Sequence, residues 1–248
     1  MAGLGGQDGE ATTTEMVGEP GGVGEPQQAG RRAMEKLEHV HGHQERTRLP
    51  AVGPFSVLMV CMGNICRSPM AERLLMLEAK SYVGDKADDL LLVHGAGTGG
   101  WHVGAAMDPG AARQVRSRGG DADGFAARQL TTEHLEYSDL ILTATGEQSK
   151  FVHGLRADAD DRTFVLGELG RLLAHVDERD LPPFAPDTDA VYARGVALVE
   201  AAARARAGRP PRPADDLDDP WGRADRYFGR IADEIEKTVQ PLARLLLS

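Results

Sequence analysis

The chain has 248 residues, which is enough for one catalytic domain with additional segments and for a sizeable buried core. Its 38 acidic and 28 basic side chains give a formal net charge of −10, which repels nucleic acid and anionic membrane surfaces. No apolar stretch approaches the roughly 20 residues of a membrane helix, and the first residues lack the basic-then-apolar pattern of a secretory signal. These features predict a soluble, cytoplasmic protein with no nucleic-acid and no membrane partner.

Residues 1–50 are predicted to form a disordered N-terminal extension. The first thirty are rich in Gly, Glu, Gln and Thr, and residues 31–48 remain polar with few apolar positions, so little surface is available to offset the entropy of ordering. His39, His41 and His43 alternate in this tail. We interpret them as an unstructured histidine patch rather than a metal site, and we expect neither a metal nor a cofactor elsewhere.

The first strong element is the apolar run Phe55–Cys61, whose length and composition predict a buried parallel strand. A glycine-containing loop, Cys61–Arg67, follows it. Ser68–Leu77 is predicted to be a helix, with the Ser68 hydroxyl as its cap and Pro69 in its first turn. Strand, loop and helix therefore follow one another without a spacer.

Further strands and helices alternate along the chain, which indicates a parallel sheet covered on both faces. The glycine-rich stretch 95–104 between two of them is expected to be a loop. The fold class is therefore α/β, with three layers: a four-stranded parallel sheet and helices on both faces. The remaining strands are predicted at 90–94, 139–145 and 163–166, and the helices at 109–118, from 131, at 147–156, 168–175, 188–207 and 225–247.

A strand that passes through a glycine loop into a helix N-terminus forms an anion site, because loop amides and the helix dipole converge there. Cys61 and Arg67 bracket this loop with five residues between them. The sulfur of Cys61 is expected beneath the anion, with the Arg67 guanidinium on two of the anion's oxygens. Such positive surroundings favour the nucleophilic thiolate. Gly63 and Asn64 are residue types that tolerate left-handed backbone.

Cys61 and Cys66 are the only cysteines in the chain, which excludes a disulfide framework and indicates thiol chemistry. For Cys66 two interpretations stay open: it fills space beneath the loop, or it forms a reversible disulfide that protects Cys61 from over-oxidation. The stretch Gly95–Gly100 matches a dinucleotide fingerprint formally. Because Trp101–Met107 stands where the helix should begin, we do not expect a nucleotide there.

The segment Val60–Glu72, VCMGNICRSPMAE, closely resembles the phosphate loop of the low-molecular-weight protein tyrosine phosphatases. The likeness continues in shorter patches: Gly95–Thr98 with Trp101, Ala127–Leu130, Asp139–Leu142, and Asp219 with Pro220. The resemblance implies that residues 54–248 form one catalytic domain with the fold of that family, in a divergent bacterial branch. It also implies a phosphotyrosine-containing protein as substrate, and phosphate or another oxyanion in the loop.

The resemblance implies a role for each matching residue. Cys61 would be the nucleophile, Arg67 the phosphoryl clamp and Asp219 the general acid and then base, with Asp215, Asp216 and Asp218 as rivals on composition alone. Ser68 would bind the sulfur and Asn64 would hold the loop in shape. The expected phosphate and substrate contacts are Met62, Gly63, Asn64, Ile65, Cys66, Ser68, Trp101 and Trp221.

Ile65 resembles the residue of tyrosine-directed members, whereas related arginine phosphatases carry Thr there. Trp101 and Trp221 would supply aromatic walls for a phenyl ring. The alternatives are a protein arginine phosphatase of the same fold and a non-catalytic phosphotyrosine-binding protein. A thioredoxin-coupled arsenate reductase resembles the fold too, but its relay cysteine has no counterpart after Cys66. Ala144 and Thr145 depart from the Met-Asp pair that relatives often carry, and Gly222 stands where many have a second aromatic.

Overall fold

The computed structural model describes residues 53–248, which belong to the compact unit formed by residues 48–248. The predicted disordered extension and the histidine patch at residues 39–43 lie outside the described residues. The described helices and strands occur in the order β1(Phe55–Cys61), α2(Arg67–Val83), α3(Ala87–Leu90), β2(Leu91–Gly97), α4(Pro109–Ser117), α5(Thr132–Glu136), β3(Leu140–Thr143), α6(Gly146–Leu155), β4(Thr163–Val165), α7(Leu166–Leu173), α8(Thr188–Arg206) and α9(Asp225–Leu247). Short 3-10 turns lie at Gly84–Lys86, Ala157–Arg162, Glu178–Asp180 and Pro213–Asp215.

The four strands form one parallel sheet in the order β2-β1-β3-β4, which confirms the predicted fold class. β1 is central and buried at every position, as a strand covered on both faces must be. It pairs with β2 along its whole length, from Phe55 opposite Leu91 to Cys61 opposite Gly97. The carboxyl ends of β1 and β2 therefore lie side by side at the edge of the sheet where Cys61 stands.

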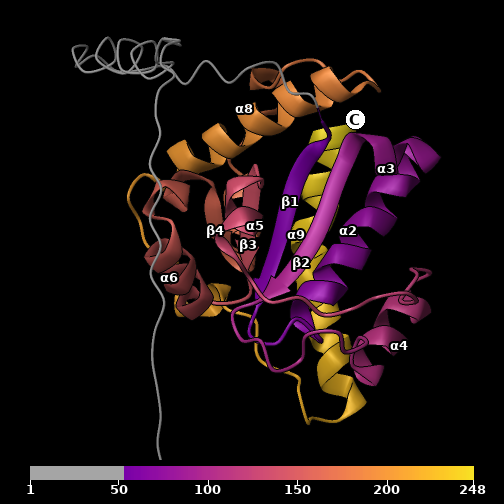
Figure 1. Ribbon diagram of the computed structural model, residues 1–248. Coiled ribbons are helices and arrows are strands. Elements are labelled where there is room, and N and C mark those ends of the chain that lie inside the picture. The colour runs from indigo at the N-terminus through magenta and orange to yellow at the C-terminus, as the bar shows by residue number, and fades with distance from the viewer. Residues whose placement is uncertain (1–52) are drawn as a thin grey trace, which may run out of the picture. The chain divides into compact units, whose positions relative to one another are not determined.

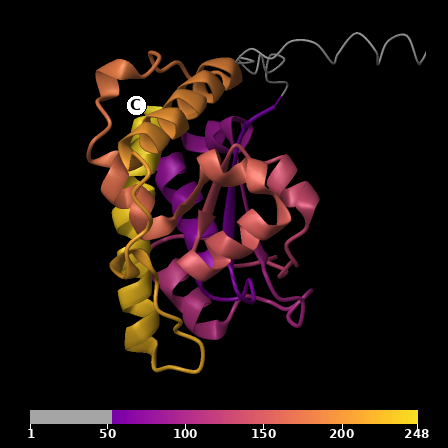
Figure 2. The same cartoon turned by 90° about the vertical axis from the view of Figure 1, so that its left-hand side faces the viewer.

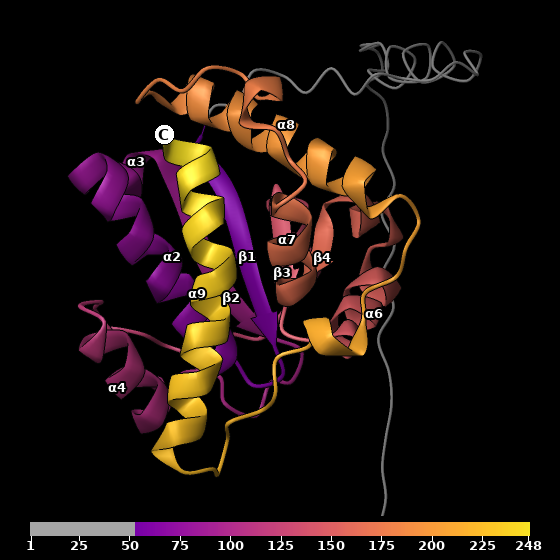
Figure 3. The same cartoon turned by 180° about the vertical axis from the view of Figure 1, so that it is seen from behind.

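Helices cover both faces of the sheet. On one face α2, α4, α7 and α9 pack together, and α9 runs beside α2 in the same direction, from the end of the sheet that carries Cys61 toward α8 (Figures 1 and 3). On the other face α5 and α6 pack on a smaller cluster that includes Leu58, Val60 and Ile141. Figure 2 shows α9 along one side of the described unit, away from α5 and α6. Alternate side chains of β1 thus enter the two helical layers, as the period of a strand requires.

Helix α8 crosses the amino-terminal end of the sheet (Figure 1). The ring of Phe55, at the start of β1, packs edge-on against Tyr192 of α8 with 6.3 Å between ring centroids. Gly195 allows this close approach, because a Cβ at that position would lie 2.4 Å from the same ring. Since Cys61 lies at the opposite end of β1, α8 contributes to the core and not to the loop after Cys61.

Most predicted elements are present, but several boundaries differ. α2 begins at Arg67 rather than Ser68, and no side chain caps it; the Ser68 hydroxyl contacts the sulfur of Cys61 instead. β2 continues to Gly97, although glycine predicted a loop from residue 95, because pairing with β1 continues to Cys61. β3 ends at Thr143, before the predicted Thr145. α3 was not predicted, and its four residues are too few to show a period.

Among residues 53–248, no helix is both long enough and apolar enough to cross a bilayer.

Candidate active site

The loop between β1 and α2 wraps around the sulfur of Cys61. The Ser68 hydroxyl lies 3.0 Å from Cys61 Sγ, and the backbone N–H of Asn64 donates to the same sulfur at 3.3 Å. The Cys61 side chain is buried. Hydrogen-bond donors around a buried sulfur stabilise negative charge on it, which is the form that attacks an electrophile.

Hydrogen bonds from neighbouring segments fix the orientation of the peptide units in this loop. The carbonyls of Cys61 and Met62 accept hydrogen bonds from the N–H groups of Thr98 and Gly99, both at 2.9 Å, and the Ile65 carbonyl accepts one from Asp108 N at 2.8 Å. In a trans peptide the N–H points opposite to the C=O. The next N–H in each case therefore points away from these outer partners and toward the interior of the loop. This geometry forms a cup of amides suited to an oxyanion.

Asn64 holds the cup in shape. Its backbone is left-handed, with φ of 53°, and its side chain is fully buried. The side-chain amide donates to Ser68 Oγ at 2.8 Å, and its carbonyl oxygen accepts from Arg128 N at 2.8 Å. Asn64 therefore links the sulfur-binding hydroxyl to the segment after α4. Gly95 leaves the space for this link, because a Cβ there would lie 2.8 Å from Asn64 Nδ2.

Arg67 presents one edge of its guanidinium to the cup. Nη1 donates to the Leu217 carbonyl at 3.2 Å, and Nη2 donates to Asp219 Oδ2 at 2.8 Å. Nε is buried and has no hydrogen-bond partner among the described residues. Because a buried N–H without a partner is costly, Nε together with Nη2 is suited to a bidentate contact with an anion.

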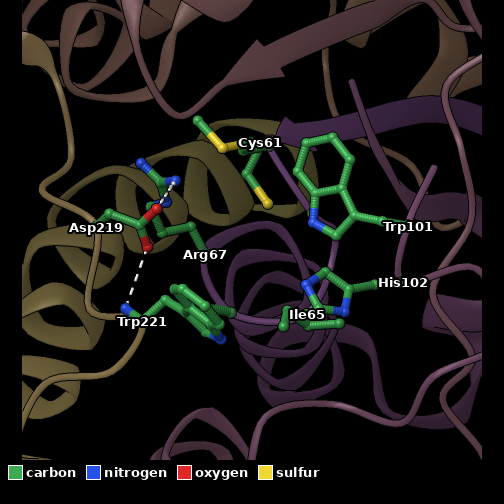
Figure 4. Close-up of a pocket in the computed structure, with 10 residues that line it drawn as sticks. Cys61, Ile65, Arg67, Trp101, His102, Asp219 and Trp221 are labelled. Atoms are coloured by element: carbon green, nitrogen blue, oxygen red, sulfur yellow. Dashed lines mark hydrogen bonds and ion pairs between the residues drawn. The ribbon is translucent and has the colours of Figure 1, made fainter. Parts of the chain in front are cut away.

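Asp219 approaches Arg67 from the segment between α8 and α9. Its Oδ2 pairs with Arg67, its Oδ1 accepts from Trp221 N at 3.1 Å, and the carboxyl group is 44% exposed (Figure 4). It is thus the carboxylate of this segment that faces both the clamp and solvent.

The three rival aspartates of this segment are bound to other elements. Asp215 pairs with Arg171 of α7 at 2.9 Å, Asp216 accepts from Gly146 N at the start of α6, and Asp218 pairs with Arg230 of α9. Burial alone would raise the pKa of Asp215, but its hydrogen bonds from Arg171 and from Arg212 N outweigh that effect and lower the pKa. These contacts leave Asp219 as the candidate acid.

A pocket of about 470 Å³, open to solvent, lies over the cup. Figure 4 shows Cys61, Arg67 and Asp219 on one side of it and Trp101, His102 and Ile65 on the other. The pocket is lined by Cys61, Met62, Gly63, Ile65, Cys66, Arg67, Trp101, His102, Asp219 and Trp221. The two indoles are exposed at the mouth, Trp101 by 67% and Trp221 by 62%, so they stand as free apolar walls.

All eleven residues proposed from the sequence lie at this site. Nine line the pocket, and Asn64 and Ser68 support the sulfur from behind it. The expected left-handed backbone is found at Asn64 but not at Gly63. Gly63 is needed for space instead, because a Cβ there would lie 2.9 Å from the His102 ring.

Sequence reasoning missed two parts of the site. His102 lines the pocket, and the only signal for it was its place after Trp101 in the loop that follows β2. The Leu217 carbonyl anchors Arg67, and a backbone acceptor leaves no signal in the sequence. Ala144 explains how Leu217 is placed, because Leu217 N donates to the Ala144 carbonyl at 2.8 Å.

Cys66 is buried beneath the loop and free. Burial raises the pKa of this thiol, and the nearby Asp108, Cys61 and Asp219 raise it further against a smaller opposite effect of Arg67. A raised pKa favours the neutral thiol, so Cys66 is a poor nucleophile.

The fold and the site together define a class. A parallel α/β sheet with a Cys-X5-Arg cup at the carboxyl end of β1 gathers a cysteine nucleophile, a guanidinium and loop amides around one oxyanion, as transfer of a phosphoryl group to cysteine requires. The sequence model of the family described as "Low molecular weight phosphotyrosine protein phosphatase" matches residues 56–207. The chain therefore belongs to this family. The match ends before Asp219, Trp221 and α9, so the place of Asp219 in the site rests on its contacts with Arg67 and Trp221.

Sequence similarity to individual phosphatases supports this family membership. The chain is 37% identical over 127 residues to the low molecular weight protein-tyrosine-phosphatase YfkJ of Bacillus subtilis, covering 51% of this chain and 76% of the relative. It is 39% identical over 106 residues to the low molecular weight protein-tyrosine phosphatase A of Mycobacterium tuberculosis, covering 43% of this chain and 62% of the relative.

Solved structures share the fold. The YwlE arginine phosphatase from Geobacillus stearothermophilus superposes with a TM-score of 0.52 at 24% identity, over 77% of this chain and 92% of that one. Vibrio vulnificus Wzb in complex with benzylphosphonate gives a TM-score of 0.53 at 20% identity, over 77% of this chain and 99% of that one. At these identities the likeness establishes the architecture alone.

Proposed function

We propose that the protein hydrolyses phosphotyrosine in protein substrates through a phospho-cysteine at Cys61. The observation that carries the proposal is the arrangement of three groups around one cup: a buried sulfur with donors on it, Arg67 with its unpartnered Nε, and Asp219 on a separate segment. The names of the relatives in Bacillus subtilis and Mycobacterium tuberculosis support the same activity.

In the first step the Cys61 thiolate attacks phosphorus, and the bond from phosphorus to the phenol oxygen breaks. The phosphoryl oxygens take the loop amides and the Nε and Nη2 edge of Arg67 as donors. Asp219 gives its proton to the departing phenolate, which leaves as tyrosine. The products are a phospho-cysteine, a free tyrosine side chain and an ionised Asp219.

Substrate binding itself prepares Asp219 for this role. Asp219 Oδ2 occupies Arg67 Nη2 at 2.8 Å, so a phosphate that takes the same donor competes with the carboxylate. A carboxyl group beside a phosphate dianion is favoured in its protonated form, because like charges repel. Displacement from Arg67 therefore both frees Asp219 and favours the proton that it must donate.

In the second step water attacks phosphorus on the face opposite Cys61. Asp219, now ionised, accepts a proton from that water, and the bond from phosphorus to sulfur breaks. Inorganic phosphate leaves and the thiolate returns, held by Ser68 Oγ and Asn64 N. A thiol nucleophile needs a reducing compartment, so cytoplasmic localisation is part of the proposal.

Phosphotyrosine suits the pocket better than shorter phosphoamino acids. The sulfur lies buried at the base, and the exposed rings of Trp101 and Trp221 stand at the mouth on opposite sides (Figure 4). A phenyl ring can fill the distance between them and stack there, whereas a serine side chain is too short to bring its phosphate to Cys61. Ile65 in the lining adds apolar surface for the ring.

Hydrolysis of an aryl phosphate by the parent protein, Cys61→Ser, Asp219→Asn and Asp218→Asn tests the proposal. We expect Cys61→Ser to abolish turnover while retaining phosphopeptide binding, and Asp219→Asn to lower kcat about 10²- to 10⁴-fold. Asp218→Asn is the matched control, since this neighbouring carboxylate pairs with Arg230 instead, and it should stay within a few-fold of the parent.

Three outcomes would contradict parts of the proposal. A parent protein that binds phosphotyrosine without releasing phosphate would be a binding protein and not an enzyme. Faster turnover of phosphoarginine than of phosphotyrosine peptides would make it an arginine phosphatase of the same fold. Equal losses in Asp218→Asn and Asp219→Asn would remove the acid role from Asp219.

A further inference from the structure

Three arginines gather around one tyrosine at the start of α9. The guanidinium carbons of Arg223, Arg226 and Arg230 lie 5.7, 5.0 and 5.9 Å from the centre of the Tyr227 ring. A tyrosine ring attracts cations through its negative faces, and here it offsets part of the repulsion among three like charges. We call these three side chains the arginine patch.

The carboxylates near the patch are already paired, either with bases outside it or with Arg230, and none of them pairs with Arg223 or Arg226. Asp219 pairs with Arg67 and Asp225 pairs with Arg113, while Asp218 and Glu234 both pair with Arg230. Arg223 and Arg226 are exposed and form no ion pair with any described residue. In a chain with a net charge of −10, the patch therefore carries two cationic groups without acidic partners.

The patch adjoins the pocket through a short turn. Arg223 N donates to the Pro220 carbonyl at 2.9 Å, so the chain reverses between Asp219 and Arg223. Trp221, at the tip of this turn, lines the pocket. An extended peptide advances about 3.3 Å per residue, so residues two to four positions from a bound phosphotyrosine reach past Trp221 to this surface.

We propose that the arginine patch binds acidic side chains that flank the phosphotyrosine of the substrate, so that the enzyme prefers phosphopeptides with Asp or Glu near the phosphorylated residue. This inference rests on the proposed function. The chemistry favours carboxylates because a guanidinium binds them through two parallel hydrogen bonds. The exposed apolar side chain of Trp221 would cover the intervening peptide backbone on one side.

The test compares kcat/KM for phosphotyrosine peptides of one length in which the flanking positions carry Asp or carry Asn, with acidic residues placed before or after the phosphotyrosine. At low ionic strength, in either the series with flanking residues before the phosphotyrosine or the series with them after it, we expect kcat/KM of the parent to be about fivefold higher for the Asp peptide than for the Asn peptide. The double variant Arg223→Gln, Arg226→Gln should lose that preference. Sodium chloride at about 0.5 M should reduce it in the parent, because exposed charges are screened.

Two controls separate this inference from the proposed function. A small aryl phosphate has no flanking residues, so the parent and the double variant should hydrolyse it at the same rate. If the parent does not hydrolyse it at all, the proposed function itself is refuted. Arg209→Gln removes another exposed arginine without an ion pair among the described residues, and it should keep the peptide preference.

A parent that hydrolyses the aryl phosphate but shows no acidic preference would overturn the inference. So would a preference that survives in the double variant. Binding of the parent to phosphatidylserine vesicles, lost in the double variant and unaccompanied by any peptide preference, would assign the patch to a membrane surface instead.

Discussion

Replacing Gly97 with alanine should damage catalysis from outside the pocket. Gly97 ends β2 opposite Cys61, and a Cβ built on it lies 2.7 Å from the Met62 carbonyl oxygen, 2.9 Å from Gly63 C and 3.0 Å from Asn64 N. All three atoms belong to the backbone of the cup. They cannot move away by a side-chain rotation, so the whole loop has to shift.

The size of the shift follows from these contacts. Non-bonded atoms prefer about 3.5 Å or more, so the loop must retreat by about 0.5–0.8 Å. Such a displacement changes how the amides and Cys61 meet phosphorus, and a 1 Å misplacement costs about 10²-fold in rate. We expect Gly97→Ala to lower kcat/KM for an aryl phosphate roughly 10- to 100-fold. Overpacking of this kind also costs about 1–3 kcal/mol of stability.

The assay compares initial rates with inhibition by inorganic phosphate, which reports the cup directly. Both kcat/KM and phosphate affinity should fall together in Gly97→Ala, while the circular dichroism spectrum stays native. Gly154→Ala is the matched control: this glycine lies in α6, and a Cβ placed on it would meet no atom within 4 Å. Its activity should equal that of the parent, with a stability gain of about 0.5–1 kcal/mol. Parent-like activity in a folded Gly97→Ala would refute the proposed packing of β2 against the cup.

Three further predictions concern other residues. Arg67→Lys keeps the charge but loses the planar fork that serves Leu217 and the anion, so kcat should fall at least about 10²-fold in the same assay. Iodoacetate at neutral pH should modify Cys61 and not Cys66, because burial raises the pKa of the Cys66 thiol. Mass spectrometry counts the modified thiols, and added phosphate should block the reaction at Cys61. Labelling of both thiols would contradict this prediction. Burial, with smaller effects of Arg128 and His134, lowers the pKa of His94 from 6.5 to about 4. As pH falls from 6.5 toward 4, the unfolded state therefore binds a proton at His94 that the folded state does not bind, and the folded state loses stability. Urea unfolding should show a loss of at most about 3 kcal/mol in that window, reduced in His94→Gln but not in His153→Gln, whose histidine is exposed.

The layered fold could be predicted because its elements have strong local signals. Phe55–Cys61 is an uninterrupted apolar run and matches β1 at both ends. The amphipathic pattern of residues 225–247 gives α9 with its observed limits. β2 was harder, because two of its last three residues are glycines whose strand conformation comes from pairing with β1 and not from their own preference.

The candidate site could be predicted where chemistry is carried by side chains. Cys61, Arg67 and Asp219 have distinctive chemistry, and the first two are fixed by a short spacing. Leu217 contributes only a carbonyl, and Gly97 only the lack of a side chain, so the role of each is visible only in the folded protein. Asp219 was chosen among four aspartates from the resemblance at Asp219 and Pro220, and the contacts that hold the other three elsewhere became visible only in the fold.

The place of Asp219 is determined by its neighbours in the chain. Asp215, Asp216, Leu217 and Asp218 contact α7, α6, the end of β3 and α9 in turn. A slip of one residue would break all four contacts at once, so the segment has one register in which a carboxylate reaches Arg67. Leu217 ties that register to the clamp itself, because its carbonyl accepts from Arg67. The family match ends before this segment, and the contacts explain how the acid still returns to the cup after α8 has crossed the far end of the sheet.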